Sequence, residues 1–380
     1  MRIYFDNAAS TPIDPEVLLV MTEAWERFPG NPSSIHLEGR SARAAIEQAR
    51  KTVAKKLNAS IGEIFFTSGG TESNNMAIKG AVRDLGVKRI LSSPIEHHCN
   101  LHSFDTLLRH QEAAVEMVRL ESNGQVDYSD LESRLAGGEG PVLVSLMHAN
   151  NETGLVLDID RVSELCQQYS AYFHTDTVQT IGQVPIDLQK TKIHFLAGSA
   201  HKFHGPKGTG FIYINNDIRI LPYIDGGSQE RNMRAGTENI AGILGLAKAL
   251  ELAYDQLEAR QSHLRHLQHL FIQGLKERFE DVQFNGDPQG RGLAKIVSAS
   301  FPPGPRSSLL IMNLDIEGIS ASGGSACSSG ADAGSHVMAA LYPGSERVTV
   351  RFSFSHNNTE AEVGRVLDAL ARLMPEKKMT

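Results

Sequence analysis

Short apolar runs alternate with helical patterns through the first two thirds of the chain. The candidate strands are Ile64-Phe66, Arg89-Ser93, Val142-Met147, Ala171-Thr175, His194-Leu196 and Gly210-Ile214. Helical patterns lie between them, such as residues 44–57, where apolar positions recur at near-helical spacing. This alternation predicts a largely parallel sheet with helices over both of its faces.

The pattern changes after residue 240. From Ile240 to Phe279 the apolar stripe predicts one long helix, and strand-like runs return at Lys295-Phe301 and Val348-Phe354. Residues 359–374 form a last amphipathic pattern. We therefore expect an α/β protein with a large domain at 15–255. A smaller α+β domain would combine residues 1–14 with 256–380.

Composition narrows the class of protein. With 41% hydrophobic and 21% charged residues in 380 positions, the chain has the composition of a folded globular protein. The net charge of -7 argues against a dedicated nucleic-acid binder. Three cysteines form no disulfide framework, and no apolar stretch has the length of a signal peptide core or membrane span. We expect a cytoplasmic protein.

Three local features carry candidate chemistry. Residues 65–72 read as a strand, a glycine turn and a helix start, whose N–H groups suit a phosphate. Asp176 ends a predicted strand, and Lys202 follows the next strand beside His201. Each feature alone has an ordinary interpretation as a turn, a helix cap or a solvated charge. Together, an acid, a lysine and a phosphate cradle are the parts of a pyridoxal phosphate site.

Ordered motifs over nearly the whole chain extend this interpretation. They are Asp6-Asn7-Ala8-Ala9, Gly30-Asn31-Pro32, Ser68-Gly69-Gly70-Thr71-Glu72, Glu96-His97, Asn150-Asn151-Glu152-Thr153-Gly154, Asp176-Thr177-Val178-Gln179, His201-Lys202, Arg234-Ala235-Gly236-Thr237, Ser325-Ala326-Cys327 and Val350-Arg351-Phe352. On these motifs the chain resembles the NifS-type cysteine desulfurases, within the class V aminotransferase group of pyridoxal phosphate enzymes. The resemblance implies a fold-type-I transferase with a large, mostly parallel seven-stranded sheet domain and a smaller α+β domain.

The resemblance also implies roles for single residues around the cofactor. Lys202 would be the Schiff-base lysine, Asp176 the partner of the pyridine nitrogen, and Gln179 a contact of the ring hydroxyl. His97 would stack on the ring and act in catalysis. The phosphate would be held by Gly70, Thr71, Ser199 and His201, with Thr237 contributed from the second subunit of a homodimer.

Two further roles concern the substrate. Arg351 and Asn151 would bind the carboxylate of L-cysteine, and Cys327 would be the nucleophile. The implied product is L-alanine, with a persulfide on Cys327 that passes to a sulfur-acceptor protein such as an iron–sulfur scaffold, or to tRNA thiolation. Small residues surround Cys327, so an exposed and mobile thiol is favoured. No metal, membrane or stable nucleic-acid partner is expected.

Alternatives remain at this stage. A selenocysteine lyase or cysteine sulfinate desulfinase would share the chemistry, and a catalytically weak scaffold that retains the cofactor is a different class. Cys99 and Cys166 are interpreted as reduced packing residues. The chain departs from the family at Phe354-Ser355-His356, at Ala333-Gly334 and at Ser228 and Asn232.

Overall fold

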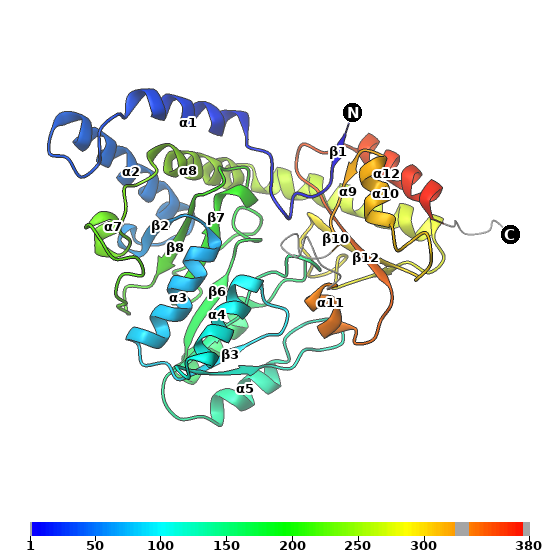
Figure 1. Ribbon diagram of the computed structural model, residues 1–380, viewed down its shortest axis with the longest axis horizontal. Coiled ribbons are helices and arrows are strands. Elements are labelled where there is room, and N and C mark those ends of the chain that lie inside the picture. Colours follow the sequence, from blue (N-terminus) through cyan, green and yellow to red (C-terminus); the bar gives the residue numbers. More distant parts are fainter. Residues whose placement is uncertain (1, 324–333, 375–380) are drawn as a thin grey trace.

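The computed structural model describes residues 2–323 and 334–374, and Figure 1 shows their arrangement. Its α-helices are α1 (Pro15–Arg27), α2 (Leu37–Lys56), α3 (Gly70–Asp84), α4 (His98–Arg109), α5 (Tyr128–Ala136), α6 (Ile159–Gln168), α7 (Gln229–Asn232), α8 (Ile240–Asp255), α9 (Leu257–Arg278), α10 (Leu310–Ile316), α11 (His336–Leu341) and α12 (Glu360–Leu373). Its strands are β1 (Ile3–Tyr4), β2 (Ile64–Thr67), β3 (Arg89–Ser92), β4 (Ala114–Met117), β5 (Val142–Ser145), β6 (Tyr172–Asp176), β7 (Phe195–Ser199), β8 (Gly210–Ile214), β9 (Gln283–Phe284), β10 (Ile296–Phe301), β11 (Ile319–Ser320) and β12 (Val348–Ser353).

A seven-stranded sheet in the order β2-β8-β7-β6-β5-β3-β4 forms the centre of the larger part. Strand β8 pairs antiparallel with both of its neighbours, and the other pairings are parallel. The predicted mostly parallel sheet is confirmed. Strand β4 at the edge was not predicted, because its side chains are at most partly buried and its sequence has no apolar run.

Neighbouring residues of each strand point into different cores. Phe66 and Val144 belong to one apolar cluster with side chains from α2, α6 and α8, whereas Phe65 and Leu143 belong to another with side chains from α3 and α4. Since side chains of a strand alternate between its faces, both faces of the sheet are covered. This is the two-faced burial that the apolar runs predict.

A separate apolar cluster lies in the smaller part of the molecule. It joins β1, β10 and β12 with helices α9, α10 and α12. Strand β10 pairs antiparallel with β12 and β9, and β1 pairs parallel with β11. The N-terminal strand thus packs with the C-terminal third, as Figure 1 shows. The exact domain boundaries stay a prediction.

The prediction of one helix from Ile240 to Phe279 is wrong. The segment forms α8 and α9, which meet at Gln256, whose φ of -108° and ψ of 13° are not helical. The buried residues of α8 belong to the core of the large sheet, whereas those of α9 belong to the second core. The break redirects the apolar stripe from one core to the other, which sequence periodicity alone does not reveal.

A buried ion pair protects the outer edge of β2. Arg50 donates to Glu230 through both terminal nitrogens, at 2.6 and 2.9 Å, and both side chains are only 2% exposed. Arg50 also donates to the carbonyl of Ile64, and the Phe66 N–H donates to Glu230. The pair therefore binds the backbone groups that a further strand would bind.

The same pair supports an unusual backbone. Glu230, Arg231 and Asn232 have φ values of 44°, 57° and 65°, in the left-handed region that favours glycine. Asparagine is among the few non-glycine residues that tolerate this region, so the departure at Asn232 is accommodated. The Arg50 contact of Glu230 anchors these strained residues to the sheet.

Glu230→Gln should lower the free energy of unfolding by about 3–5 kcal/mol, because it removes the buried counter-charge that both terminal nitrogens of Arg50 contact. Urea denaturation measures the change. Glu47→Gln is the matched control, since Glu47 contacts the same arginine at 3.2 Å but is 32% exposed, and it should cost about 1 kcal/mol or less. Equal losses in the two variants would contradict the role assigned to the buried pair.

Candidate active site

A cavity of about 210 Å³ lies where the two cores meet. The carboxyl ends of β6 and β7 and the start of α3 form one side, and Ala8, Ala9 and Arg351 of the second part form the other. Ten predicted site residues line it: Gly70, Thr71, His97, Asn151, Asp176, Gln179, Ser199, His201, Lys202 and Arg351. Segments far apart in sequence therefore converge on one space.

Two predicted residues are not among those lining this cavity. Thr237 lines a neighbouring cavity of about 140 Å³ with Ser68, Thr209 and Arg234. Cys327 lies outside the described residues, so its placement and mobility stay predictions. Ala333, one of the departures from the family, also lies outside them. His356, which belongs to the segment 354–356 that differs from the family pattern, is not among the residues that line the cavity. Its ring packs against that of His204, with the ring centroids 4.5 Å apart.

The start of α3 is built to receive an anion. Its N-cap, Gly69, has φ 153° and makes no capping hydrogen bond from a side chain. A Cβ at Gly70 would lie 2.6 Å from Val178 Cγ2, so glycine allows the backbone to approach β6 and β7 closely. Uncapped N–H groups and the positive end of the helix dipole favour a negatively charged group here.

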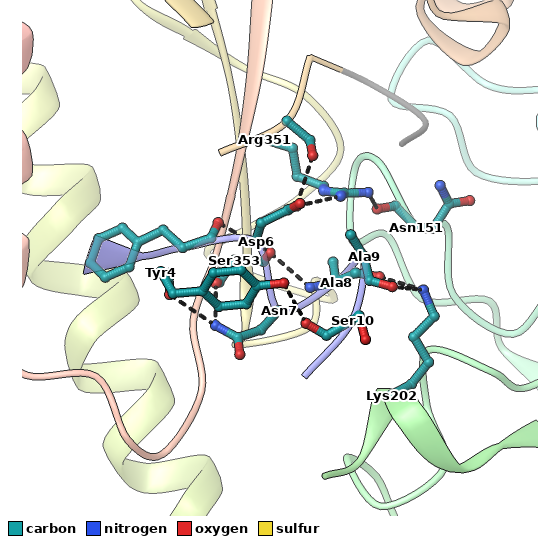
Figure 2. A network of polar contacts seen from close by, with 12 residues as sticks. Tyr4, Asp6, Asn7, Ala8, Ala9, Ser10, Asn151, Lys202, Arg351 and Ser353 are labelled. Carbon is teal, nitrogen blue, oxygen red and sulfur yellow. Dashed lines mark hydrogen bonds and ion pairs between the residues drawn. The ribbon is translucent and has the colours of Figure 1, made fainter. Parts of the chain in front are cut away.

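Lys202 lies in a short 3-10 turn after β7 and reaches across the cavity to the N-terminal segment. Its Nζ donates to the carbonyls of Ala8 and Ala9 at 2.7 and 2.8 Å, as Figure 2 shows. The preceding residue, His201, contacts Ser10 Oγ through Nδ1 at 3.2 Å. Burial and the nearby Lys202 lower the pKa of His201 to about 4, so its ring is neutral near pH 7.

The Asp176 carboxylate is 5% exposed and lies at the end of β6. Its Oδ1 accepts a hydrogen bond from the Val178 N–H at 2.9 Å, and its Oδ2 accepts one from Asn74 Nδ2 at 2.7 Å. Gln179 donates through Nε2 to the carbonyl of Ala8 at 2.9 Å, and its buried Oε1 has no hydrogen-bond partner among the described residues. The cavity that Asp176 lines therefore also has a buried acceptor oxygen, Gln179 Oε1, that receives no hydrogen bond from the described residues.

Arg351 on β12 is 2% exposed and is held from two sides. Its guanidinium donates to Asp6 Oδ1 and to the carbonyl of Asn151, each at 2.8 Å. Figure 2 shows these contacts from the N-terminal segment and the Asn151 loop. An arginine fixed in this way can present its remaining N–H groups to a carboxylate.

The interpretation of Cys99 as a packing residue is wrong. Cys99 is half-buried, lines the cavity, and has its Sγ 3.0 Å from His97 Nδ1. His97 is the N-cap of α4, and its Nδ1 accepts a hydrogen bond from the Cys99 N–H at 3.2 Å. This bond fixes the ring at the N-terminus of the helix. Cys166, by contrast, is buried in the core, and burial raises the pKa of its thiol. No sequence signal separates the two cysteines, because both lie in helices.

Neither a metal site nor a membrane span is found within 2–323 and 334–374. The neighbouring rings of His98, His102 and His336 do not form a group that could hold a metal ion. In the same ranges, no helix is both long and apolar enough to cross a bilayer.

Comparisons with known proteins agree with this geometry. The family described as Aminotransferase class-V matches residues 3–366. A cysteine desulfurase IscS of Dictyoglomus turgidum is 42% identical over 98% of this chain and 94% of its own length. A cysteine desulfurase IscS of Methanosarcina thermophila is 41% identical over 98% of this chain and 92% of its own length. A solved NifS-like protein superposes with a TM-score of 0.89 at 35% identity, over 98% of this chain and 99% of its own, so the expected fold is confirmed.

Lys295, which sequence reasoning missed, is buried beside this cavity. It precedes β10, is 2% exposed, and its Nζ has no hydrogen-bond partner among the described residues. Burial, with the charges of Lys202 and Arg351, lowers the pKa of Lys295 to about 7. The unfolded chain therefore binds a proton at Lys295 more tightly than the folded chain does.

Lys295→Met should raise the free energy of unfolding of the ligand-free chain by up to about 5 kcal/mol at pH 7. In the folded chain, keeping the proton on the buried amine and releasing it at this pH both cost free energy, and methionine avoids both costs. Because the pKa of Lys295 is lower in the folded chain than in the unfolded chain, this lysine destabilises the fold at pH values below its unfolded pKa. The loss in free energy of unfolding grows as the pH falls from about 10.5 to about 7. Urea denaturation at pH 7, 8.5 and 10 should show the gap to wild type closing as pH rises. A gap that is constant with pH would show that Lys295 keeps its proton at no cost.

Proposed function

The chain belongs to the aminotransferase class V family, and we propose that it is a pyridoxal-phosphate-dependent cysteine desulfurase. The observation that carries the proposal is the convergence of Lys202, Asp176, the α3 start and Arg351 on one cavity. The names of the relatives support the choice of cysteine as substrate.

The residues of the cavity fit the cofactor. The uncapped start of α3, with Gly70, Thr71 and Ser199, would hold a phosphate, and Gln179 Oε1 offers an unused acceptor to a ring hydroxyl. Asp176 would hold a protonated ring nitrogen, and the Lys202 amine would bond to the aldehyde carbon. When bound, pyridoxal phosphate supplies a sink for the electron pair left when the substrate Cα loses its proton.

The remaining side chains act on the amino acid substrate. Arg351 binds the substrate carboxylate, since Asp6 and the Asn151 carbonyl fix its guanidinium at the cavity wall. The Lys202 amine is placed to take the proton from the substrate Cα and to return a proton to Cα when L-alanine forms. His97 at the start of α4 lines the same cavity, where it would stack on the cofactor ring and act in catalysis.

Cys327 completes the reaction in this proposal. Its thiolate attacks the sulfur of the substrate, so that an S–S bond forms as the Cβ–S bond breaks. The electron pair of the broken bond stays on Cβ and takes up a proton, which gives the methyl group of L-alanine. Cys327 then carries a persulfide whose outer sulfur can pass to an acceptor thiol.

The wider setting of the activity belongs to the proposal as well. Delivery of sulfur to an iron–sulfur scaffold or to tRNA thiolation, a cytoplasmic location, and a homodimer that supplies Thr237 across its interface are inferred from the resemblance. Exposed apolar side chains on the first two helices, including Trp25 at 74%, are compatible with a subunit contact. Selenocysteine lyase and cysteine sulfinate desulfinase activities are the second candidates, and alanine release from the three substrates side by side separates them.

Borohydride reduction of the holoenzyme should fix a pyridoxyl group on Lys202, because among the described residues it is the lysine that lines the cavity with Asp176. Peptide mapping by mass spectrometry identifies the labelled lysine. Lys202→Ala should lose the label, and Lys207→Ala is the control that should keep it. A label on Lys207 or Lys295 would contradict the assignment.

Cys327→Ser should reduce alanine formation from cysteine by roughly a thousandfold or more while pyridoxal phosphate remains bound, because the nucleophile alone is removed. Alanine release and the cofactor absorbance are measured on the same samples. Mass spectrometry of cysteine-treated wild type should place the added sulfur on Cys327. Sulfur on Cys99, which lines the cavity, would assign the nucleophile to that residue instead.

A further inference from the structure

Three buried polar side chains form a series of hydrogen bonds that begins at the Asp176 carboxylate. Asn74 Nδ2 donates to Asp176 at 2.7 Å, and Asn74 Oδ1 lies 3.0 Å from His174 Nε2. His174 Nδ1 lies 2.8 Å from Ser145 Oγ. Asn74, His174 and Ser145 are fully buried, and they come from three elements, α3, β6 and β5.

The direction of these hydrogen bonds is fixed by chemistry. A carboxylate only accepts, so Asn74 turns its NH₂ group toward Asp176 and its carbonyl toward His174. His174 must then donate from Nε2 and accept at Nδ1, which leaves Ser145 as the donor at the end. Burial lowers the pKa of His174 to about 3, so the ring is neutral and can serve in this tautomer.

We propose that Asn74 is a positioning residue of the cofactor site, which orients the Asp176 carboxylate toward the ring nitrogen, with His174 and Ser145 fixing the Asn74 amide. The inference rests on the proposed function, because it takes the ligand of Asp176 to be the pyridine ring of the cofactor. Asn74 is also one of the residues that line the cavity, so its amide lies at the site itself.

A neutral donor suits this task better than a cation. An arginine or lysine at this place would neutralise Asp176 and compete with a protonated ring nitrogen, whereas an amide holds the carboxylate and leaves its charge available. The second hydrogen of Asn74 Nδ2 is engaged by Cys99 Sγ at 3.4 Å. Both amide groups therefore have partners, and the side chain is held in one orientation.

Asn74→Asp tests the proposal, since it replaces the donor by a second carboxylate of the same shape. The affinity of the apo chain for pyridoxal phosphate should fall by about tenfold to a hundredfold, because a hydrogen bond to a charged group is lost and like charges meet. The affinity for a carbocyclic analogue, with a C–H group in place of the ring nitrogen, should change less than threefold. Fluorescence titration measures both.

Asn75→Asp is the matched control. It lies next to Asn74 on α3, but its side chain bonds to the Thr71 carbonyl and to Ser103 rather than to Asp176. It should change the two affinities by the same factor, because both ligands carry the same phosphate group. Ser145→Ala is the milder variant, which should weaken the cofactor a few-fold, again without affecting the analogue, if Asn74→Asp does not fold.

Equal losses for the cofactor and the analogue, or no loss for either, would overturn the role of Asn74. Failure of the proposed function looks different. A wild-type chain that binds pyridoxal phosphate but releases no alanine from cysteine contradicts the desulfurase activity, while the comparison of affinities still decides the inference.

Discussion

The candidate site depends on the segment from Asp6 to Thr11, which turns at residues 7–9 and hydrogen bonds to both cores. On one side, the Ala8 N–H donates to Ser353 Oγ at 2.8 Å, and Asp6 accepts from Arg351. On the other, the carbonyls of Ala8 and Ala9 accept from Lys202, and the Thr11 N–H donates to the carbonyl of His201. Figure 2 shows the contacts of Asp6, Ala8 and Ala9 with Arg351, Ser353 and Lys202. Arg351 and Lys202 are thus placed relative to each other by one short stretch of backbone.

Three buried polar atoms at or beside the cavity are available to a ligand. Native interiors leave few buried polar groups without partners, because each costs about 1–3 kcal/mol. At or beside this cavity, Gln179 Oε1, Arg351 Nε and Lys295 Nζ lack partners among the described residues. A ligand that carries a phosphate, a ring hydroxyl and a carboxylate supplies acceptors and a donor, so its binding would recover part of this cost and stabilise the fold.

The sequence predicted most of the site because motifs identify residues whose type is fixed by chemistry. Asp176, Lys202 and Arg351 lie where strands end or where the second core meets the first, and the alternation of apolar runs predicts that architecture. Side chains that act through others were not predicted. Asn74 matches a motif only as one of several polar residues on a helix, and Lys295 precedes an apolar strand as any surface lysine could. Their burial is a property of the packed elements, which a single sequence does not contain.

The residues that flank the segment carrying Cys327 contact residues of the candidate site. Ser322 donates to Asp6 Oδ1 at 2.8 Å, the same oxygen that binds Arg351, and also pairs with the Arg351 backbone. After the segment, Ser335 donates to Glu152, next to Asn151 in the sequence. The contacts of Ser322 and Ser335 therefore hold both flanks of this segment beside Arg351 and the loop of Asn151, which line the cavity.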